Sequence, residues 1–230
     1  MKFGIVIFPG TWSDRDTYKA LSDVMGYDSN YIWHNDSNVD NYDCIILPGG
    51  FSYGDYLRSG AIAKFSPIMD SVKEHAKKGK PIIGICNGFQ ILCESGLLPG
   101  ALVANRDMQF ICEWVNLKIV NRKSFFTSKI SRNKNILRIP ISHGEGNYIA
   151  DENVIKSLED NNQIILKYSN SAGDITDKSN PNGSVNNIAG ITNKKGNILG
   201  MMPHPEKAAE KMLGSEDGQL LFKSIIENYK

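Results

Sequence analysis

Residues 81–90 read Pro81-Ile82-Ile83-Gly84-Ile85-Cys86-Asn87-Gly88-Phe89-Gln90. The apolar run from Pro81 to Ile85 is typical of a buried strand, and the residues from Asn87 to Glu94 are typical of a short helix. Cys86 therefore lies on a strand-to-helix turn, with one glycine two residues before it and another two residues after it. This is the spacing of a nucleophile elbow, in which side chains at the two glycine positions would collide with neighbouring backbone.

The position of Cys86 also favours covalent chemistry at its thiol. A helix N-terminus carries unpaired N–H groups and partial positive charge, which stabilise a thiolate over a thiol. The backbone N–H of Asn87 is directed to where a substrate oxyanion would form. The other cysteines, Cys44, Cys93 and Cys112, lie in apolar or helical stretches, and we expect them to be structural.

A cysteine nucleophile needs a base, and the chain has four histidines. His34 and His75 lie among polar residues, which predicts that they are solvated. His204 directly follows an apolar strand, where α/β proteins place catalytic groups, and two prolines restrict its backbone. We therefore expect His204 to be the base, and His143 is the alternative.

Glu206 completes a predicted triad. It lies two residues after His204, so in an extended segment both side chains would share one face. Its carboxylate can accept the other imidazole N–H and thereby set the tautomer. The predicted triad is Cys86, His204 and Glu206, in that chain order.

A second oxyanion donor is expected in the loop that starts Leu47-Pro48-Gly49-Gly50. The two glycines follow a buried strand and allow backbone N–H groups to turn towards a ligand, with Gly50 as the candidate donor. A plain glycine turn is the alternative interpretation. A phosphate-binding loop is disfavoured because neither dinucleotide-binding nor P-loop spacing is present.

Apolar strands alternate with helical patterns in the first half of the chain, which predicts an open, mostly parallel central sheet with helices on both faces. We expect one domain over residues 1–230, with a long loop at 170–187. The other predicted strands are Phe3–Phe8, Tyr31–His34, Cys44–Leu47, Trp114–Val120, Leu137–Ile141, Ile164–Tyr168, Ile188–Thr192 and Ile198–Met202. The other predicted helices are Asp14–Met25, a helix from Ser66-Pro67 to Gly79, Val154–Leu158 and Gly218–Tyr229.

The composition excludes several classes of protein. The net charge of +1 gives no reason to expect nucleic acid or an anionic membrane as a partner. No apolar run is long enough to span a bilayer. The four cysteines form no CxxC pair, so we expect no metal site, and a reducing cytoplasmic compartment is consistent with their number.

These motifs resemble the class I glutamine amidotransferases. The segments that carry the resemblance are 84–90 around Cys86 and Pro203-His204-Pro205-Glu206. The match is closest to the branch that supplies glutaminase subunits to purine biosynthesis, and it covers nearly the whole chain. The segments that look specific to this branch are Leu47–Ala63, His143–Tyr148, Asn180–Ser184 and Gly200–Glu206.

The resemblance implies a flavodoxin-like architecture, L-glutamine as substrate and a glutamyl thioester on Cys86. It also implies that Gln90 helps to shape the glutamine pocket. The ammonia would pass to a synthetase subunit that converts formylglycinamide ribonucleotide to its amidine, in a complex with a small third subunit. ATP and Mg²⁺ would belong to the synthetase, and no cofactor is expected in this chain.

Three alternatives remain at this point. Another class I amidotransferase, or a cysteine hydrolase or peptidase of the same fold, would share the elbow. A non-catalytic binding subunit could keep the fold, although such a subunit would be free to lose any triad residue. Activity on free glutamine, compared with activity on peptides, separates these classes.

Overall fold

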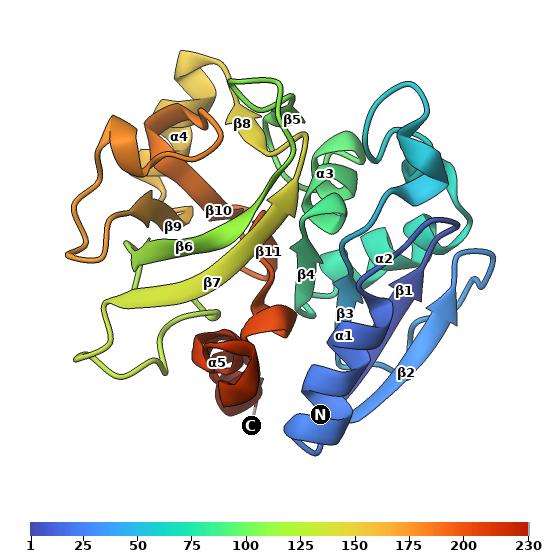
Figure 1. Cartoon of the computed structure of the whole chain (residues 1–230). Helices are drawn as coiled ribbons and strands as arrows, with labels where there is room; N and C mark the ends of the chain where they lie inside the picture. The colour runs from blue at the N-terminus through green and yellow to red at the C-terminus, as the bar shows by residue number, and fades with distance from the viewer. Residues whose placement is uncertain (230) are drawn as a thin grey trace.

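A nine-stranded sheet forms the centre of the computed structural model, which describes residues 1–229 (Figure 1). The strands are β1 (Lys2–Ile7), β2 (Asp28–Trp33), β3 (Cys44–Leu47), β4 (Ile82–Ile85), β5 (Ala101–Val103), β6 (Ile111–Ile119), β7 (Ile136–His143), β8 (Asn147–Ile149), β9 (Ile164–Ser169), β10 (Ile188–Thr192) and β11 (Ile198–Met201). The order in the large sheet is β2-β1-β3-β4-β11-β10-β9-β6-β7, while β5 pairs with β8 separately.

The large sheet has two halves. Strands β2, β1, β3, β4 and β11 pair in parallel, and the remaining pairs are antiparallel. Every residue of β3, β4 and β11 is buried, because helices cover both faces of this parallel half. The predicted open α/β sheet is therefore confirmed, and the antiparallel half extends it.

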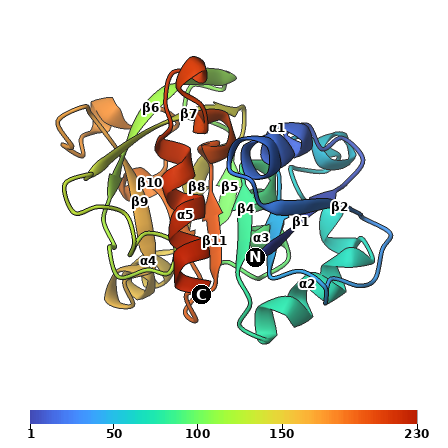
Figure 2. The ribbon, with the colours of Figure 1, turned by 90° about the horizontal axis from the view of Figure 1, so that it is seen from below.

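The α-helices lie on both sides of the sheet. They are α1 (Asp14–Tyr18), α2 (Ile68–Lys77), α3 (Asn87–Glu94), α4 (Glu152–Asp160) and α5 (Asp217–Tyr229). Figures 1 and 2 show α1 and α5 on one face of the sheet, with α2 and α3 on the opposite face. Helix α3 packs against β3, β4 and β11, so the N-terminus of α3 lies at the carboxyl ends of these strands. Among residues 1–229, every helix is too short or too polar to cross a bilayer.

Several element boundaries differ from the sequence-based expectation. The predicted helix 14–25 is α1 followed by a π-helical turn at Lys19–Val24. The predicted strand 31–34 is β2, which begins three residues earlier because it pairs with β1 over its whole length. The loop 170–187 contains two 3-10 turns, and β5 and β8 were not predicted because each has only three residues.

Two side chains differ in exposure from what their sequence neighbours predicted. Cys112 is exposed on β6, although its neighbours in the sequence are apolar. His75 is 2% exposed on α2, where it was expected to be solvated. In both cases the packing of the element, rather than the sequence around the residue, decides which face is covered. Burial, together with the nearby charge of Lys80, lowers the pKa of His75 to about 4.

This burial predicts a stability that decreases in acid. His75 stays neutral in the folded chain, whereas the unfolded chain binds a proton there below about pH 6.5. Because the unfolded state then holds more protons, the free energy of unfolding should fall by about 2 kcal/mol as the pH drops from about 6.5 to about 4. Urea titrations across this range measure the decrease. The non-titrating His75→Asn variant should show a smaller decrease, and an equal decrease in both proteins would contradict the assignment.

Candidate active site

Cys86 occupies the turn between β4 and α3, as the sequence predicts. Its backbone has φ 51° and ψ −107°, a conformation that residues other than glycine rarely adopt. Such a conformation costs about 1–3 kcal/mol and persists only where the surrounding structure imposes it. Cys86 is 5% exposed, so the strained turn holds its thiol at the end of β4 in one direction.

The two flanking glycines are required by close backbone contacts. A Cβ on Gly88 would overlap the carbonyl oxygen of Leu47 on the neighbouring strand. A Cβ on Gly84 would lie 2.6 Å from the carbonyl oxygen of Gly88 itself. The elbow therefore depends on two positions without side chains, which confirms the collision inferred from the spacing.

His204 and Glu206 form a hydrogen bond of 2.5 Å between Nδ1 and Oε1, and both side chains are buried. The residues after His204 form a 3-10 turn, Pro205–Ala208, rather than the expected extended segment. The turn still brings the Glu206 carboxylate to the His204 imidazole, because the two residues are only two positions apart and the chain curves back between them. Among residues 1–229, the second carboxylate oxygen of Glu206 has no hydrogen-bond partner.

The environment of His204 favours its protonated form. Burial alone would lower its pKa, but the charges of Glu206 and Cys86 outweigh this effect and raise the pKa to about 10. At neutral pH, His204 therefore holds a proton next to the nucleophile. This proton is available for a leaving group that departs from Cys86.

Gly49 packs tightly against two members of the predicted triad. A Cβ on Gly49 would lie 2.6 Å from Cε1 of His204 and 3.4 Å from Cβ of Cys86. Among the described residues, Nε2 of His204 has no hydrogen-bond partner, and the Cys86 thiol is directed at the carbonyl of Ser142, 3.6 Å away. His204 and Cys86 line the same cavity, so the predicted base lies near the predicted nucleophile with its Nε2 unpaired among residues 1–229.

Both predicted oxyanion donors lie near Cys86, since Asn87 directly follows it and Gly50 lines the same cavity. Asn87 is the first residue of α3, and its N–H has no acceptor within residues 1–229. Gly50 has φ 152° and forms a bridge with Thr11, in which the neighbouring N–H of Phe51, rather than that of Gly50, donates to Gly10. Among the described residues neither N–H has an acceptor, and their role as an oxyanion hole stays a prediction.

A cavity of about 210 Å³ opens onto the nucleophile. Its size suits a small polar substrate rather than a folded polypeptide. It is lined by Trp12, Ser13, Gly50, Phe51, Cys86, Phe110, Ser142, His204 and Lys207. The cavity thus brings together three of the predicted site residues, Gly50, Cys86 and His204. Glu206 does not line it but bonds to His204.

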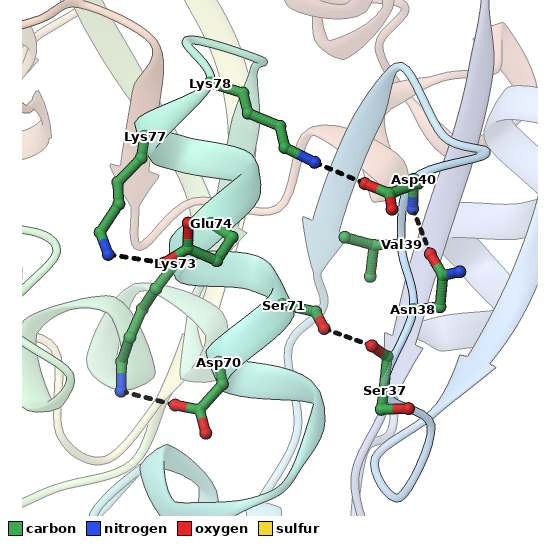
Figure 3. A pocket seen from close by; sticks show the side chains of 10 residues that line it. All are labelled: Ser37, Asn38, Val39, Asp40, Asp70, Ser71, Lys73, Glu74, Lys77 and Lys78. Atoms are coloured by element: carbon green, nitrogen blue, oxygen red, sulfur yellow. Dashed lines mark hydrogen bonds and ion pairs between the residues drawn. The ribbon is translucent and has the colours of Figure 1, made fainter.

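A larger groove of about 450 Å³ lies elsewhere, between the segment 37–40 and α2, as Figure 3 shows. Its ion pairs are exposed: Lys78 pairs across the groove with Asp40 at 2.7 Å, and Lys73 pairs with Asp70 within α2 at 3.4 Å. Exposed pairs of this kind are ordinary solvated surface. None of the predicted catalytic residues lines this groove.

His143, the alternative base, is buried and has other partners. Its Nδ1 donates to Oδ1 of Asn105 at 3.1 Å, and its Nε2 lies 3.5 Å from Nδ2 of Asn182. Burial, assisted by the charge of His204, lowers the pKa of His143 to about 4, so the ring is neutral. His143 therefore connects three loops near the site. Sequence reasoning missed Asn105, because an isolated asparagine carries no recognisable spacing, and it singled out the segment Asn180–Ser184 without predicting the contact of Asn182 with His143.

Gln90 does not line the cavity around Cys86. Its Nε2 donates to the carbonyl of Glu145 at 2.6 Å, and its Oε1 accepts from Nδ2 of Asn87 at 2.9 Å. Asn87 in turn accepts a hydrogen bond from the N–H of Ser52 at 3.2 Å. Gln90 thus links helix α3 to the loops on either side of the cavity, and its expected contact with substrate stays a prediction.

Residues 1–220 match the family described as the CobB/CobQ-like glutamine amidotransferase domain. The chain is 55% identical, over 227 residues, to "Phosphoribosylformylglycinamidine synthase subunit PurQ" of Moorella thermoacetica, covering 99% of this chain and 96% of that protein.

Solved structures agree. "Structure of PurLQS from Thermotoga maritima" contains a chain that superposes with a TM-score of 0.87 at 43% identity, covering 100% of this chain and 99% of that one. Another glutamine amidotransferase from Thermotoga maritima has a TM-score of 0.55 at 15% identity, covering 100% and 91%, which shows the fold alone. The elbow, the His204–Glu206 pair and these matches lead to one conclusion: the chain belongs to the CobB/CobQ-like glutamine amidotransferase family.

Proposed function

We propose that this chain is the glutaminase subunit of phosphoribosylformylglycinamidine synthase in purine biosynthesis. The 55% identity to a relative with that name, over nearly the full length of both chains, supports the assignment. The family supplies the reaction class, hydrolysis of an amide of glutamine. The observation that carries the chemistry is the 2.5 Å bond between His204 and Glu206, directly behind the strained Cys86.

In the first half of the reaction, Sγ of Cys86 attacks the side-chain amide carbon of L-glutamine. The carbonyl oxygen gains negative charge, which the N–H groups of Gly50 and Asn87 stabilise. The bond between carbon and nitrogen then breaks, and His204 gives its proton to the departing ammonia. The products of this half are ammonia and a glutamyl thioester on Cys86.

In the second half, a water molecule attacks the thioester. His204, now neutral, takes a proton from this water, and the same two N–H groups stabilise the second oxyanion. The carbon–sulfur bond breaks and glutamate leaves. The Cys86 sulfur is released as a thiolate and His204 is protonated again, as at the start of the reaction. Glu206 acts as a positioning residue throughout, because its carboxylate holds the imidazole tautomer and favours the imidazolium.

The ammonia passes to a synthetase subunit, which converts formylglycinamide ribonucleotide to its amidine with ATP and Mg²⁺. We include a small third subunit in the complex. The support for both partners is that a relative 43% identical belongs to an assembly described as PurLQS. The described residues contain no cluster of three or more His, Cys, Asp or Glu that could hold a metal ion.

The test is reconstitution of this chain with its synthetase, using glutamine labelled with ¹⁵N in the side-chain amide. We expect the label to appear in the amidine product, and release of glutamate in equal amount. Ammonia supplied directly should support synthesis without this chain. A chain that hydrolyses a peptide panel faster than glutamine, or that transfers no label to the product, would contradict the proposal.

A further inference from the structure

A cavity of about 700 Å³ lies at the edge of the sheet away from Cys86. It is formed by three segments: 119–125 at the end of β6, 161–163 before β9, and 192–196 between β10 and β11. Because β4 and β11 run in parallel, the start of β11 lies at the edge opposite to Cys86, which follows the end of β4. We name this cavity the basic pocket.

The lining of the basic pocket is positively charged. It contains no aspartate or glutamate, and its cationic residues are Arg122, Lys123, Lys194 and Lys195. The ion pairs among residues 1–229 all involve other cations, so none of these four has a carboxylate partner there. Since the whole chain has a net charge of only +1, positive charge is concentrated in this pocket.

Two of the four cations are held in place by neutral groups. Arg122 is half-buried, and its Nη2 donates to the carbonyl of Lys134 at 2.5 Å and to Oδ1 of Asn135 at 2.7 Å. Nζ of Lys195 donates to the carbonyl of Lys77 at 2.8 Å. These acceptors fix the two side chains without neutralising their charges, which an anion in the pocket would do.

Hydrogen bonds join the three segments to one another in the absence of a ligand. Nδ2 of Asn121 donates to the carbonyl of Asn162 at 2.6 Å. The N–H of Thr192 donates to the carbonyl of Gln163 at 2.8 Å, and Nε2 of Gln163 donates to the carbonyl of Thr192 at 2.7 Å. The basic pocket is therefore preformed, which lowers the entropic cost of binding.

Donors for an anion are free at one side of the basic pocket. Lys123 and Lys194 are exposed, so their ammonium groups can move onto a ligand. The turn 193–196 is closed by the N–H of Gly196, which donates to the carbonyl of Asn193 at 3.0 Å. The backbone N–H groups of Lys194 and Lys195, inside this turn, have no acceptor among residues 1–229.

The basic pocket also has an apolar wall, made of Ile119, Val120 and Phe125. Val120 is 40% exposed and Phe125 is half-buried, so both can still cover part of a ligand. A volume of about 700 Å³ is in the range that holds a whole organic ligand. An inorganic ion would leave most of this volume and the apolar wall unused.

We propose that the basic pocket binds a phosphate ester of nucleotide size. Lys123 and Lys194 contact its phosphate group, and Val120 and Phe125 pack against its ring. A phosphate monoester carries about two negative charges near neutral pH, which suits several converging cations better than a single carboxylate does. The inference does not depend on the proposed function, because the pocket shares no lining residue with the Cys86 cavity.

The experiment is isothermal titration calorimetry of the whole chain at constant ionic strength, with adenosine 5′-monophosphate, inorganic phosphate and adenosine as separate probes. We expect the nucleotide to bind at one site with a Kd below about 1 mM, and the other two probes to bind more weakly. Lys123→Glu and Lys194→Glu should each weaken nucleotide binding by about tenfold or more. Both side chains are exposed, so the fold should be kept.

Lys178→Glu is the matched control, because Lys178 is exposed, lies in the turn Asp177–Ser179 and does not line the basic pocket. Wild-type affinity in this variant, with weaker binding in the other two, supports the assignment. Equal weakening in all three variants would show a general effect of charge and overturn the site. Adenosine that binds as tightly as the nucleotide would overturn the phosphate contact. Equal affinity for inorganic phosphate and the nucleotide would overturn the ester, and saturation only above about 1 mM would overturn the proposal as a whole.

Discussion

Cys86→Ser is expected to abolish glutamine-dependent synthesis by the reconstituted complex while synthesis from added ammonia continues. The hydroxyl is far less acidic than a thiol, so serine cannot supply the thiolate with which Cys86 would attack. Serine also keeps the size and polarity of the side chain in the strained turn. We expect a decrease of about 10⁴-fold or more in glutamine hydrolysis, because the covalent step is lost. Glutamate release measures one activity, and amidine formation from ammonium chloride measures the other.

Cys112→Ser is the matched control. Cys112 is exposed on β6 and does not line the cavity, so the same chemical change there should leave both activities near the wild-type level. A Cys86→Ser protein that hydrolyses glutamine at a rate near wild type would show that the thiol is not the nucleophile. Co-sedimentation of the Cys86→Ser protein with the synthetase checks that the lost glutamine-dependent activity is not a failure of assembly.

Glu206→Gln is expected to lower glutamine hydrolysis by about 10²- to 10⁴-fold, with little change in the fold. The amide keeps the volume of the carboxylate but removes the charge that raises the pKa of His204 to about 10. The imidazolium then loses its main stabilisation, and either tautomer of the neutral ring can form. We expect both the maximum rate and the shape of the pH–rate profile to change. Steady-state rates measured between about pH 6 and about pH 9 would show both effects.

Glu210→Gln provides the comparison for this variant. Glu210 lies on the same side of the molecule and lines a cavity of about 300 Å³ together with Glu206. It forms a surface ion pair with Lys19 at 2.7 Å and does not contact His204. Removing its charge should leave the rate within about twofold of wild type, since exposed pairs contribute little. Equal losses in the two variants would mean that charge near the cavity matters, rather than the contact with His204.

The elbow could be predicted from the sequence because its geometry is local. A buried strand, two glycines and a helix start within ten residues leave few conformations for Cys86, and its positive φ follows from them. The pair of His204 and Glu206 could also be predicted, since the two residues lie only two positions apart in the chain. Its backbone was predicted as extended and is a 3-10 turn, and two residues of spacing allow the contact in both cases.

The burial of individual histidines could not be predicted in the same way. His75 lies among polar neighbours in the sequence and was expected to be solvated, yet packing buries it, and His143 is buried as well. The partners of His143 are Asn105 and Asn182, which are separated from it by nearly forty residues on either side. Contacts of this kind depend on how loops from distant strands meet, and no local pattern encodes them.

The sequence by itself predicted the candidate nucleophile Cys86, its candidate base His204, the candidate orienting carboxylate Glu206 and the α/β class, because each depends on residue types at short spacing or on the apolar pattern of single strands. Only the tertiary structure showed that the N–H groups of Gly50 and Asn87 have no acceptor among residues 1–229, and that Asn105 and Asn182 meet at His143. The physical reason is the parallel sheet, which carries the ends of β1, β3, β4 and β11 to one edge and joins loops that are far apart in the chain.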